Sequence, residues 1–371
     1  MKDGFEDAEE ARPQLRYPFE RSPEAGTGEA VEVAPGVLWL RMPLQGPLAA
    51  INVWALDDGE GWTIVDTGLR NPESAQGWRS AFAGALAGKP VLRVIGTHMH
   101  PDHVGLAGWI LRKFPGARLW MTRLEYITAR MLIADTGREA PQDGLDFFKE
   151  AGWSDEDLEG YRTRFGGFGQ GFYPLPDSYR RLRDGETLRI GAHDWTVVVG
   201  CGHSPEHACL YCPALKLLIS GDQVLPRISS NVSVHPTEPD ADPLNDWLTT
   251  LAKVRDEVPD EVLVLPAHND PFYGLHARIN HLIRGHERGL SRLERRLAEP
   301  KRVVDIFGAL FARPIGPDLI GMASGEAIAH LNYLWKRGRA GWTTDADGVR
   351  WWRAPAQPLD SEPLMPEPHH A

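Results

Sequence analysis

One short segment, rich in histidine, limits what this chain can fold into: Thr97-His98-Met99-His100-Pro101-Asp102-His103. It comes directly after residues 91–96, a β-branched and apolar run that predicts a buried strand. Side chains two residues apart point the same way in an extended segment, so His98 and His100 share one side, and the turn at Pro101 redirects Asp102 and His103. Imidazole and carboxylate together suit zinc, iron or manganese rather than calcium or magnesium. The segment therefore predicts a metal site at the end of a strand.

Three further strand-like runs end in residues of the same kinds. Residues 195–199 precede His203, residues 217–220 precede Asp222, and residues 262–266 precede His268. Asp66 closes a hairpin predicted from alternating apolar residues around the turn at 57–59. Ligands delivered by several strand ends are typical of layered α/β proteins.

Taken in order, these motifs resemble those of the metallo-β-lactamase-fold hydrolase superfamily. They are Asp66-Thr67-Gly68, His98-Met99-His100-Pro101-Asp102-His103, Gly202-His203-Ser204, Ser220-Gly221-Asp222 and Pro266-Ala267-His268. The resemblance spans roughly residues 31–284. It implies an α/β fold, a four-layer αββα sandwich, and a metal-dependent hydrolase.

The resemblance also implies a partition of seven ligands between two metal ions. One ion would be held by His98, His100 and His203, and the second by Asp102, His103 and His268, with Asp222 bridging the pair. Asp222 and Asp102 are the candidate catalytic residues. Three protein ligands per ion leave a position open for water, as catalytic zinc requires. We expect two zinc ions, with iron or manganese left open, and a metal-bridging hydroxide as the nucleophile.

Two further residues are predicted to support the ligands rather than bind metal. Asp66, at a strand end, is expected to accept a hydrogen bond from a ligand imidazole, with a simple turn-forming role as the alternative. His207 is expected to orient the loop that carries His203. Cys201 raises the alternative of a thiolate nucleophile, although a small buried thiol is the commoner case.

The 371 residues are predicted to form two ordered domains with flexible ends. We expect a leader (1–28), a hydrolase domain (29–300) with a helical, aromatic-rich insertion (125–181), a winged-helix-like domain (301–354) and a tail (355–371). The insertion is interpreted as a substrate-facing lid, a homodimer contact or a plain connector. The C-terminal segment resembles the winged-helix appendage of a branch that includes a β-lactamase-like endoribonuclease.

The composition indicates an acidic, globular protein. The formal net charge is −11, which disfavours nucleic acid as a partner. The three cysteines, Cys201, Cys209 and Cys212, are too few for a disulfide framework and favour a reducing, cytoplasmic location. No signal peptide or membrane span is expected, and hence no membrane partner.

The leading hypothesis is a dinuclear hydrolase of a small carbonyl substrate, namely a thioester, lactone or ester. The main alternative is a phosphodiesterase or endoribonuclease that uses the C-terminal winged helix, with its Lys336, Arg337, Arg339 and Arg350. Lesser alternatives are a mononuclear iron persulfide-type oxygenase and a β-lactamase. The complete ligand set disfavours a metal-stabilised scaffold without catalysis.

Overall fold

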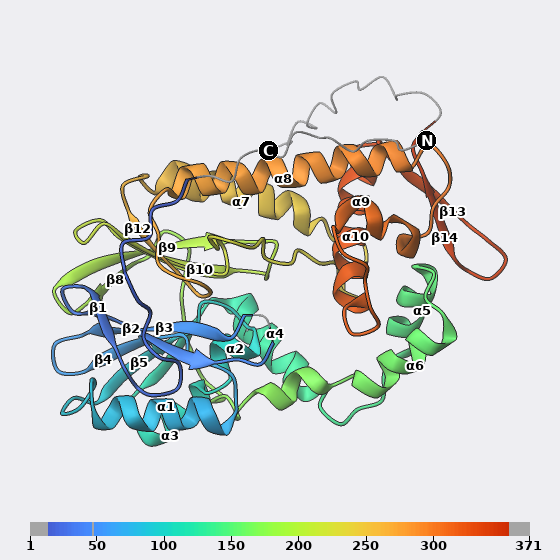
Figure 1. Cartoon of the computed structure of the whole chain (residues 1–371). Helices are drawn as coiled ribbons and strands as arrows, with labels where there is room; N and C mark the ends of the chain where they lie inside the picture. The colour runs from blue at the N-terminus through green and yellow to red at the C-terminus, as the bar shows by residue number, and fades with distance from the viewer. Residues whose placement is uncertain (1–13, 47, 356–371) are drawn as a thin grey trace, which may run out of the picture. The chain divides into compact units, whose positions relative to one another are not determined.

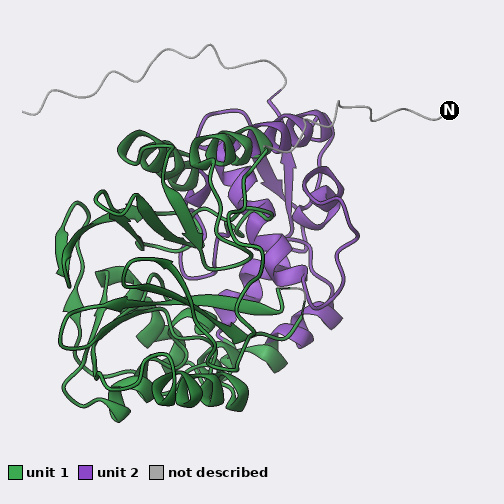
Figure 2. Ribbon diagram, turned by 60° about the vertical axis from the view of Figure 1, so that its left-hand side comes forward, with its two compact units in different colours: residues 1–140, 162–232, 245–285 green, residues 141–161, 233–244, 286–371 purple. Residues whose placement is uncertain are grey.

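The fold is taken from a computed structural model that describes residues 14–46 and 48–355. The chain divides into two compact units, each assembled from separate stretches of sequence (Figure 2). Unit 1 comprises residues 1–140, 162–232 and 245–285, and unit 2 comprises residues 141–161, 233–244 and 286–371. The predicted domain boundaries at residues 28, 300 and 354 stay predictions. The predicted tail, apart from Pro355, lies outside the described residues.

Unit 1 contains two β-sheets, of which the first has seven strands in sequence order. These are β1 (Val31–Ala34), β2 (Val37–Pro43), β3 (Ala50–Asp57), β4 (Trp62–Val65), β5 (Val91–Ile95), β6 (Arg118–Met121) and β7 (Arg180–Arg181). Strands β1 to β4 pair antiparallel, and β4 to β7 pair parallel. The parallel pairs place the carboxyl ends of β4 and β5 side by side at one edge of the sheet.

The second sheet has the order β12-β11-β10-β9-β8. Its strands are β8 (Thr187–Ile190), β9 (His193–Gly200), β10 (His207–Cys212), β11 (Leu217–Gly221) and β12 (Leu263–Pro266). Strands β8 to β11 pair antiparallel and β11 pairs parallel to β12, so β9, β11 and β12 all run in one direction. Their carboxyl ends therefore lie at the same edge.

Helices cover the outer faces of the two sheets (Figure 1). Helices α1 (Pro72–Ala83) and α3 (Ala107–Lys113) cover the first sheet, and α7 (Pro243–Glu257) and α8 (Leu275–Arg296) cover the second. Helices α2 (Pro101–Val104) and α4 (Arg123–Ala134) lie at the strand ends. The sequences of α6 (Asp155–Arg164), α7 and α8 each contain a boundary between the two units. Successive residues of β2 point to opposite faces, so Trp39 enters the core between the sheets and Leu40 the core beneath α1 and α3. This α/β arrangement of helix, sheet, sheet and helix confirms the predicted four-layer fold.

Unit 2 contains several helices and a small hairpin. Its elements include α5 (Gln142–Glu150), η2 (Val303–Ile306), α9 (Phe307–Leu310), α10 (Ile320–Trp335), β13 (Gly341–Thr344) and β14 (Arg350–Arg353). Trp153 stacks on Phe148 with ring centroids 4.1 Å apart, and its indole Nε1 donates to Ser324 Oγ at 2.8 Å. Part of the predicted insertion thus packs with the C-terminal helices. The winged-helix resemblance of this unit stays a prediction.

Helices α2 and α3 are separate, because Leu106 N donates to Gly68 O instead of continuing the helix. Local structure differs from the sequence prediction in two places. The strands predicted from the sequence do not include β10. Residues 14–28, predicted to belong to a flexible leader, include a backbone bridge from Arg16 to Tyr273 and a hydrogen bond from Ser22 to Asp270.

Within the described part of the chain, no helix combines the length and the apolar composition needed to span a bilayer.

Candidate metal centre

The predicted ligands meet because the strands that carry them end at the same place in unit 1. The carboxyl ends of the parallel strands β4 and β5 bring together Asp66 and the loop at residues 97–103. In the second sheet, β9, β11 and β12 lead to His203, Asp222 and His268. The structure therefore assembles donors from both sheets at one edge of the sandwich.

The first group of donors consists of His98, His100, His203 and Asp222. Their ligand atoms lie within 4.8 Å of one another. His98 Nε2 is 2.8 Å from His100 Nδ1, and His203 Nε2 is 3.4 Å from Asp222 Oδ2. Three imidazoles and one carboxylate oxygen thus converge on one point.

The second group consists of Asp102, His103 and His268. Asp102 Oδ2 lies 3.4 Å from His268 Nε2 and 3.7 Å from His103 Nε2. The other oxygen of Asp222, Oδ1, lies 3.5 Å from His268 Nε2 and 3.6 Å from His103 Nε2. Asp222 therefore presents one oxygen to each group, which is the geometry of a bridging carboxylate.

The chemistry of these donors fits two bound cations. His103 Nε2, His203 Nε2 and Asp222 Oδ1 are buried and have no hydrogen-bond partner within the described residues. Buried polar atoms left without partners are costly, and one cation in each group would satisfy all three. Burial, together with the neighbouring His203, lowers the pKa of His100 to about 3, which keeps the imidazole neutral as a ligand must be. Two such groups are consistent with a dinuclear metal site.

Three of the imidazoles donate a hydrogen bond through Nδ1 to an acceptor oxygen, and this bond fixes the direction of Nε2. His103 Nδ1 lies 2.8 Å from Asp66 Oδ2, and His203 Nδ1 lies 2.7 Å from the carbonyl oxygen of Asn231. His268 Nδ1 lies 3.3 Å from the carbonyl oxygen of Ala50. In each case Nε2 is aimed at the carboxylates of the centre.

Asp66 has the contact expected of it. Its Oδ1 accepts from Thr97 N at 2.9 Å and its Oδ2 accepts from Thr97 Oγ1 at 2.8 Å, in addition to the contact with His103. Burial acts to lower the pKa of His103, but the carboxylates of Asp66, Asp102 and Asp222 raise it well above its ordinary value. The pair joins the end of β4 to the histidine loop.

His207 contacts a different loop from the one predicted. Its Nε2 accepts a hydrogen bond from the backbone nitrogen of Asp222 at 3.0 Å, and burial lowers its pKa to about 3, so this nitrogen is free to accept. The ring also fills the space beside Gly221, whose φ is +50°. A Cβ at Gly221 would lie 2.4 Å from His207 Nε2. His207 therefore holds the backbone of Asp222, while its predicted role in orienting the His203 loop stays a prediction.

Cys201 does not have the environment of a nucleophile. Burial raises the pKa of its thiol to about 11, and the nearby Asp246 carboxylate adds to the effect. At neutral pH the sulfur is protonated, and thiolate attack is disfavoured.

The predicted insertion places one ring against the centre. Phe168, in η1 (Gly167–Gly171), lies edge-on to His100 with ring centroids 6.3 Å apart, and it also packs on Phe172 at 5.3 Å. Phe168 is half-buried. Its ring therefore lines one side of the first group of donors.

A residue that the sequence analysis missed also contacts both metal loops. Glu125 is fully buried in the first turn of α4. Its carboxylate accepts hydrogen bonds from Met99, Ser204 and Glu206, which lie in the loops of the histidine ligands. A single glutamate at the start of a helix normally indicates a solvent-exposed residue that favours the helix dipole. Nothing in the neighbouring sequence marks Glu125 as different.

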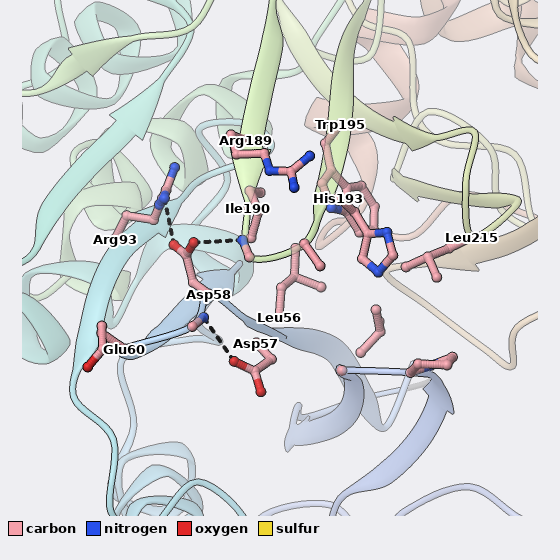
Figure 3. A pocket seen from close by; sticks show the side chains of 16 residues that line it. Leu56, Asp57, Asp58, Glu60, Arg93, Arg189, Ile190, His193, Trp195 and Leu215 are labelled. Carbon is pink, nitrogen blue, oxygen red and sulfur yellow. Dashed lines mark hydrogen bonds and ion pairs between the residues drawn. The ribbon is translucent and has the colours of Figure 1, made fainter.

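A separate hollow in unit 1 lies away from the metal loops (Figure 3). It has a volume of about 700 Å³ and is lined by turns that include Asp58 and Gly191, at the opposite strand ends from the metal loops. Its buried carboxylate, Asp58, pairs with Arg93 at 2.6 Å and accepts from Gly191 N at 2.8 Å. These contacts hold two turns together.

Comparison with known proteins identifies the family. The sequence profile described as the Metallo-beta-lactamase superfamily matches residues 46–268. The chain belongs to the metallo-beta-lactamase superfamily. A second profile, described as Metallo-beta-lactamase-like, C-terminal domain, matches residues 290–355. Membership of this superfamily, together with the two donor groups, makes the protein a metal-dependent hydrolase.

Solved structures of the superfamily match nearly the whole chain. A beta-lactamase domain protein from Burkholderia ambifaria is 40% identical with a TM-score of 0.83, covering 92% of this chain and 98% of that one. A metallo-beta-lactamase family protein from Thermus thermophilus is 26% identical with a TM-score of 0.73, covering 87% and 100%. Both support the fold described above.

Two curated proteins are similar to this chain at lower identity. An uncharacterized protein of Aquifex aeolicus is 24% identical over 61% of this chain and 87% of its own length. An atrochrysone carboxyl ACP thioesterase of Aspergillus fumigatus is 24% identical over 56% of this chain, and the match spans 36% of that protein.

Proposed function

We propose that this member of the superfamily is a dinuclear zinc hydrolase of a small carbonyl substrate, namely a thioester, lactone or ester. The observation that carries the proposal is the position of Asp222, which presents Oδ2 to His203 and Oδ1 to His103 and His268. A carboxylate shared in this way serves two ions at once. The similarity to a thioesterase favours thioesters within the class.

The proposed ions would supply the positive charge that activates water near neutral pH and polarises the substrate carbonyl. The side chains of the two donor groups would hold these ions in place. Zinc is the proposed metal because five of the seven donors are imidazoles. His103 keeps its Nδ1 proton directed at Asp66, so that Nε2 faces the centre. Phe168 excludes water from the side of His100 and provides an apolar surface for the substrate.

Nucleic acid cleavage receives less support. Three arginines that suggested it are engaged within unit 2, where Arg337 pairs with Asp242 at 2.9 Å, Arg339 with Glu294 at 2.6 Å, and Arg350 with Glu150 at 2.7 Å. Cations already paired with carboxylates attract phosphate weakly.

The test combines metal analysis with a substrate panel on one protein preparation. The panel contains thioesters, lactones, simple esters, β-lactams and phosphodiesters. We expect about two zinc ions per chain and the fastest turnover on a thioester, lactone or ester. Replacing Asp222 with Ala should remove both hydrolysis and part of the bound metal. Preferential cleavage of phosphodiesters, or an active and metal-replete Asp222→Ala variant, would reject the proposal.

A further inference from the structure

Glu125 joins the two loops from which the first group of donors comes. Its Oε2 accepts a hydrogen bond from Met99 N at 2.8 Å, and its Oε1 accepts from Ser204 Oγ and from Glu206 N, both at 2.7 Å. Met99 lies between His98 and His100, and Ser204 directly follows His203. One carboxylate therefore accepts three hydrogen bonds from groups in two separate loops.

The start of α4 reinforces this connection. Thr122 Oγ1 donates to Glu206 O at 2.7 Å, and Leu124 N donates to the Glu206 carboxylate at 2.8 Å. Together with the two bonds that Glu125 makes to the same loop, these contacts fasten residues 204–206 to the first turn of the helix. The helix is thus a fixed support for the His203 loop.

The burial of Glu125 indicates that the contact is specific. Its exposed fraction is 0%, and a buried carboxyl group is costly unless its oxygens are hydrogen-bonded. Burial raises the pKa of Glu125 to about 7, against the lowering effect of the Ser204 hydroxyl. An apolar residue of similar size would satisfy the packing, but it would leave Met99 N and Glu206 N without acceptors.

The first group of donors depends on such a connection because it spans both sheets. His98 and His100 follow β5 of the seven-stranded sheet, while His203 follows β9 of the five-stranded sheet. The imidazole centroids of His98 and His203 are 5.0 Å apart, and those of His100 and His203 are 4.7 Å apart. These separations are set by how the two loops are held relative to each other.

We propose that Glu125 is a positioning residue for the metal centre, fixing the loop of His98 and His100 at the distance from His203 that one metal ion requires. The inference rests on the proposed metal ligands, although not on the proposed substrate. In the second group, His103 is held by Asp66, and no hydrogen bond joins this group to Glu125 within the described residues.

The test measures zinc affinity at each group separately by competition with a coloured chelator. A His268→Ala background isolates the first group, and a His203→Ala background isolates the second. Glu125→Gln preserves the volume of the side chain but replaces one acceptor oxygen with an N–H donor. In the His268→Ala background, we expect this change to weaken zinc binding by about 10- to 100-fold, as for other residues that orient ligands. In the His203→Ala background, the zinc affinity should change by no more than about twofold. Glu125→Ala should weaken the first group further.

A second readout reports geometry rather than affinity. In cobalt-substituted protein, the visible bands of the first group should shift or lose intensity in Glu125→Gln. Leu188→Ala, which removes a buried side chain from the core between the sheets, serves as the control for lost stability and should leave bands and affinity unchanged. Should Glu125→Ala fail to fold, the Gln variant alone decides.

Wild-type affinity and wild-type cobalt bands in Glu125→Gln would overturn the inference, and equal weakening at both groups would reduce Glu125 to a general structural residue. A wild-type protein that binds no metal would instead reject the ligand assignment itself.

Discussion

Asp66 combines an unusual backbone conformation with side-chain contacts to two residues of the histidine loop. Its φ of +60° lies in the left-handed region, which costs a non-glycine residue on the order of 1–3 kcal/mol. That conformation lets one carboxylate reach Thr97 and His103 together. Backbone strain at this position is therefore compensated by contacts that align a proposed ligand.

Replacing Asp66 with Asn should disturb the second group of donors first. The amide of Asn can present its N–H₂ to His103 Nδ1, which favours the tautomer whose Nε2 carries the proton and cannot bind metal. We expect zinc at Asp102, His103 and His268 to weaken by about 10- to 100-fold, with the first group less affected. Stepwise chelation followed by metal analysis measures the order of loss. The same order is expected for His103→Ala, and depletion of the first group ahead of the second would contradict the partition.

At the scale of elements, Asn52 of β3 connects the two sheets next to a proposed ligand. Its side-chain nitrogen donates to Pro266 O at 2.8 Å and to Asn269 O at 2.6 Å, and its oxygen accepts from Trp39 Nε1 at 2.8 Å. Pro266 and Asn269 flank the turn that carries His268. The buried amide thus fixes the end of β12 against β3.

Replacing Asn52 with Ala should therefore cost both stability and metal. The change leaves the Trp39 indole and two carbonyls without partners inside the protein, and we expect a loss of about 2–4 kcal/mol in the free energy of unfolding. Zinc affinity of the second group should fall as well. Urea unfolding and chelator competition measure the two effects. Asn71→Ala, which removes the cap of α1 at a cost of about 1 kcal/mol, is the control and should leave metal affinity intact. Normal second-group affinity in Asn52→Ala would contradict the role assigned to β3.

A buried pair of histidines in unit 2 should make the molecule sensitive to acid. His286 Nδ1 of α8 lies 3.4 Å from His330 Nε2 of α10, and His330 Nδ1 bonds to Glu326 O. Burial lowers the pKa of His286 to about 3 and that of His330 to about 4. An unfolded histidine titrates near 6.5, so below that pH the unfolded chain binds more protons than the folded one. Stability is complete above pH 6.5 and falls as the pH drops toward 4, by at most about 1.4 kcal/mol per pH unit for each histidine.

The variant His286→Gln removes one of these two titrations. Between pH 6.5 and 4.5, its free energy of unfolding should fall by about 2 kcal/mol less than that of the wild type. Urea unfolding at several pH values gives the two curves. Parallel curves would show that this histidine is not responsible for the acid sensitivity.

At the scale of the whole molecule, the sequence predicted most of the strands that end in candidate metal ligands. The apolar runs before His98, Asp222 and His268 identified β5, β11 and β12, and the parallel pairing of strands then brings their ends together. Strand β10 escaped prediction because it begins at His207, a polar residue in a loop-like context. Glu125 and Asn52 escaped for a different reason, since their partners lie far away in sequence and only the packed sheets bring them into contact. Local patterns contain no information on such pairs.

The close approach of His207 to Gly221 has a consequence for how this site can change through mutation. Any side chain at position 221 would collide with the imidazole at 207, so the two positions cannot vary independently. A smaller residue at 207 would have to appear first, and the intermediate sequence would lack the acceptor for the backbone nitrogen of Asp222. Each single step toward an alternative pair therefore passes through a weakened protein. In a library that randomises both positions, selection for zinc retention should return the parental pair far more often than either residue with a new neighbour.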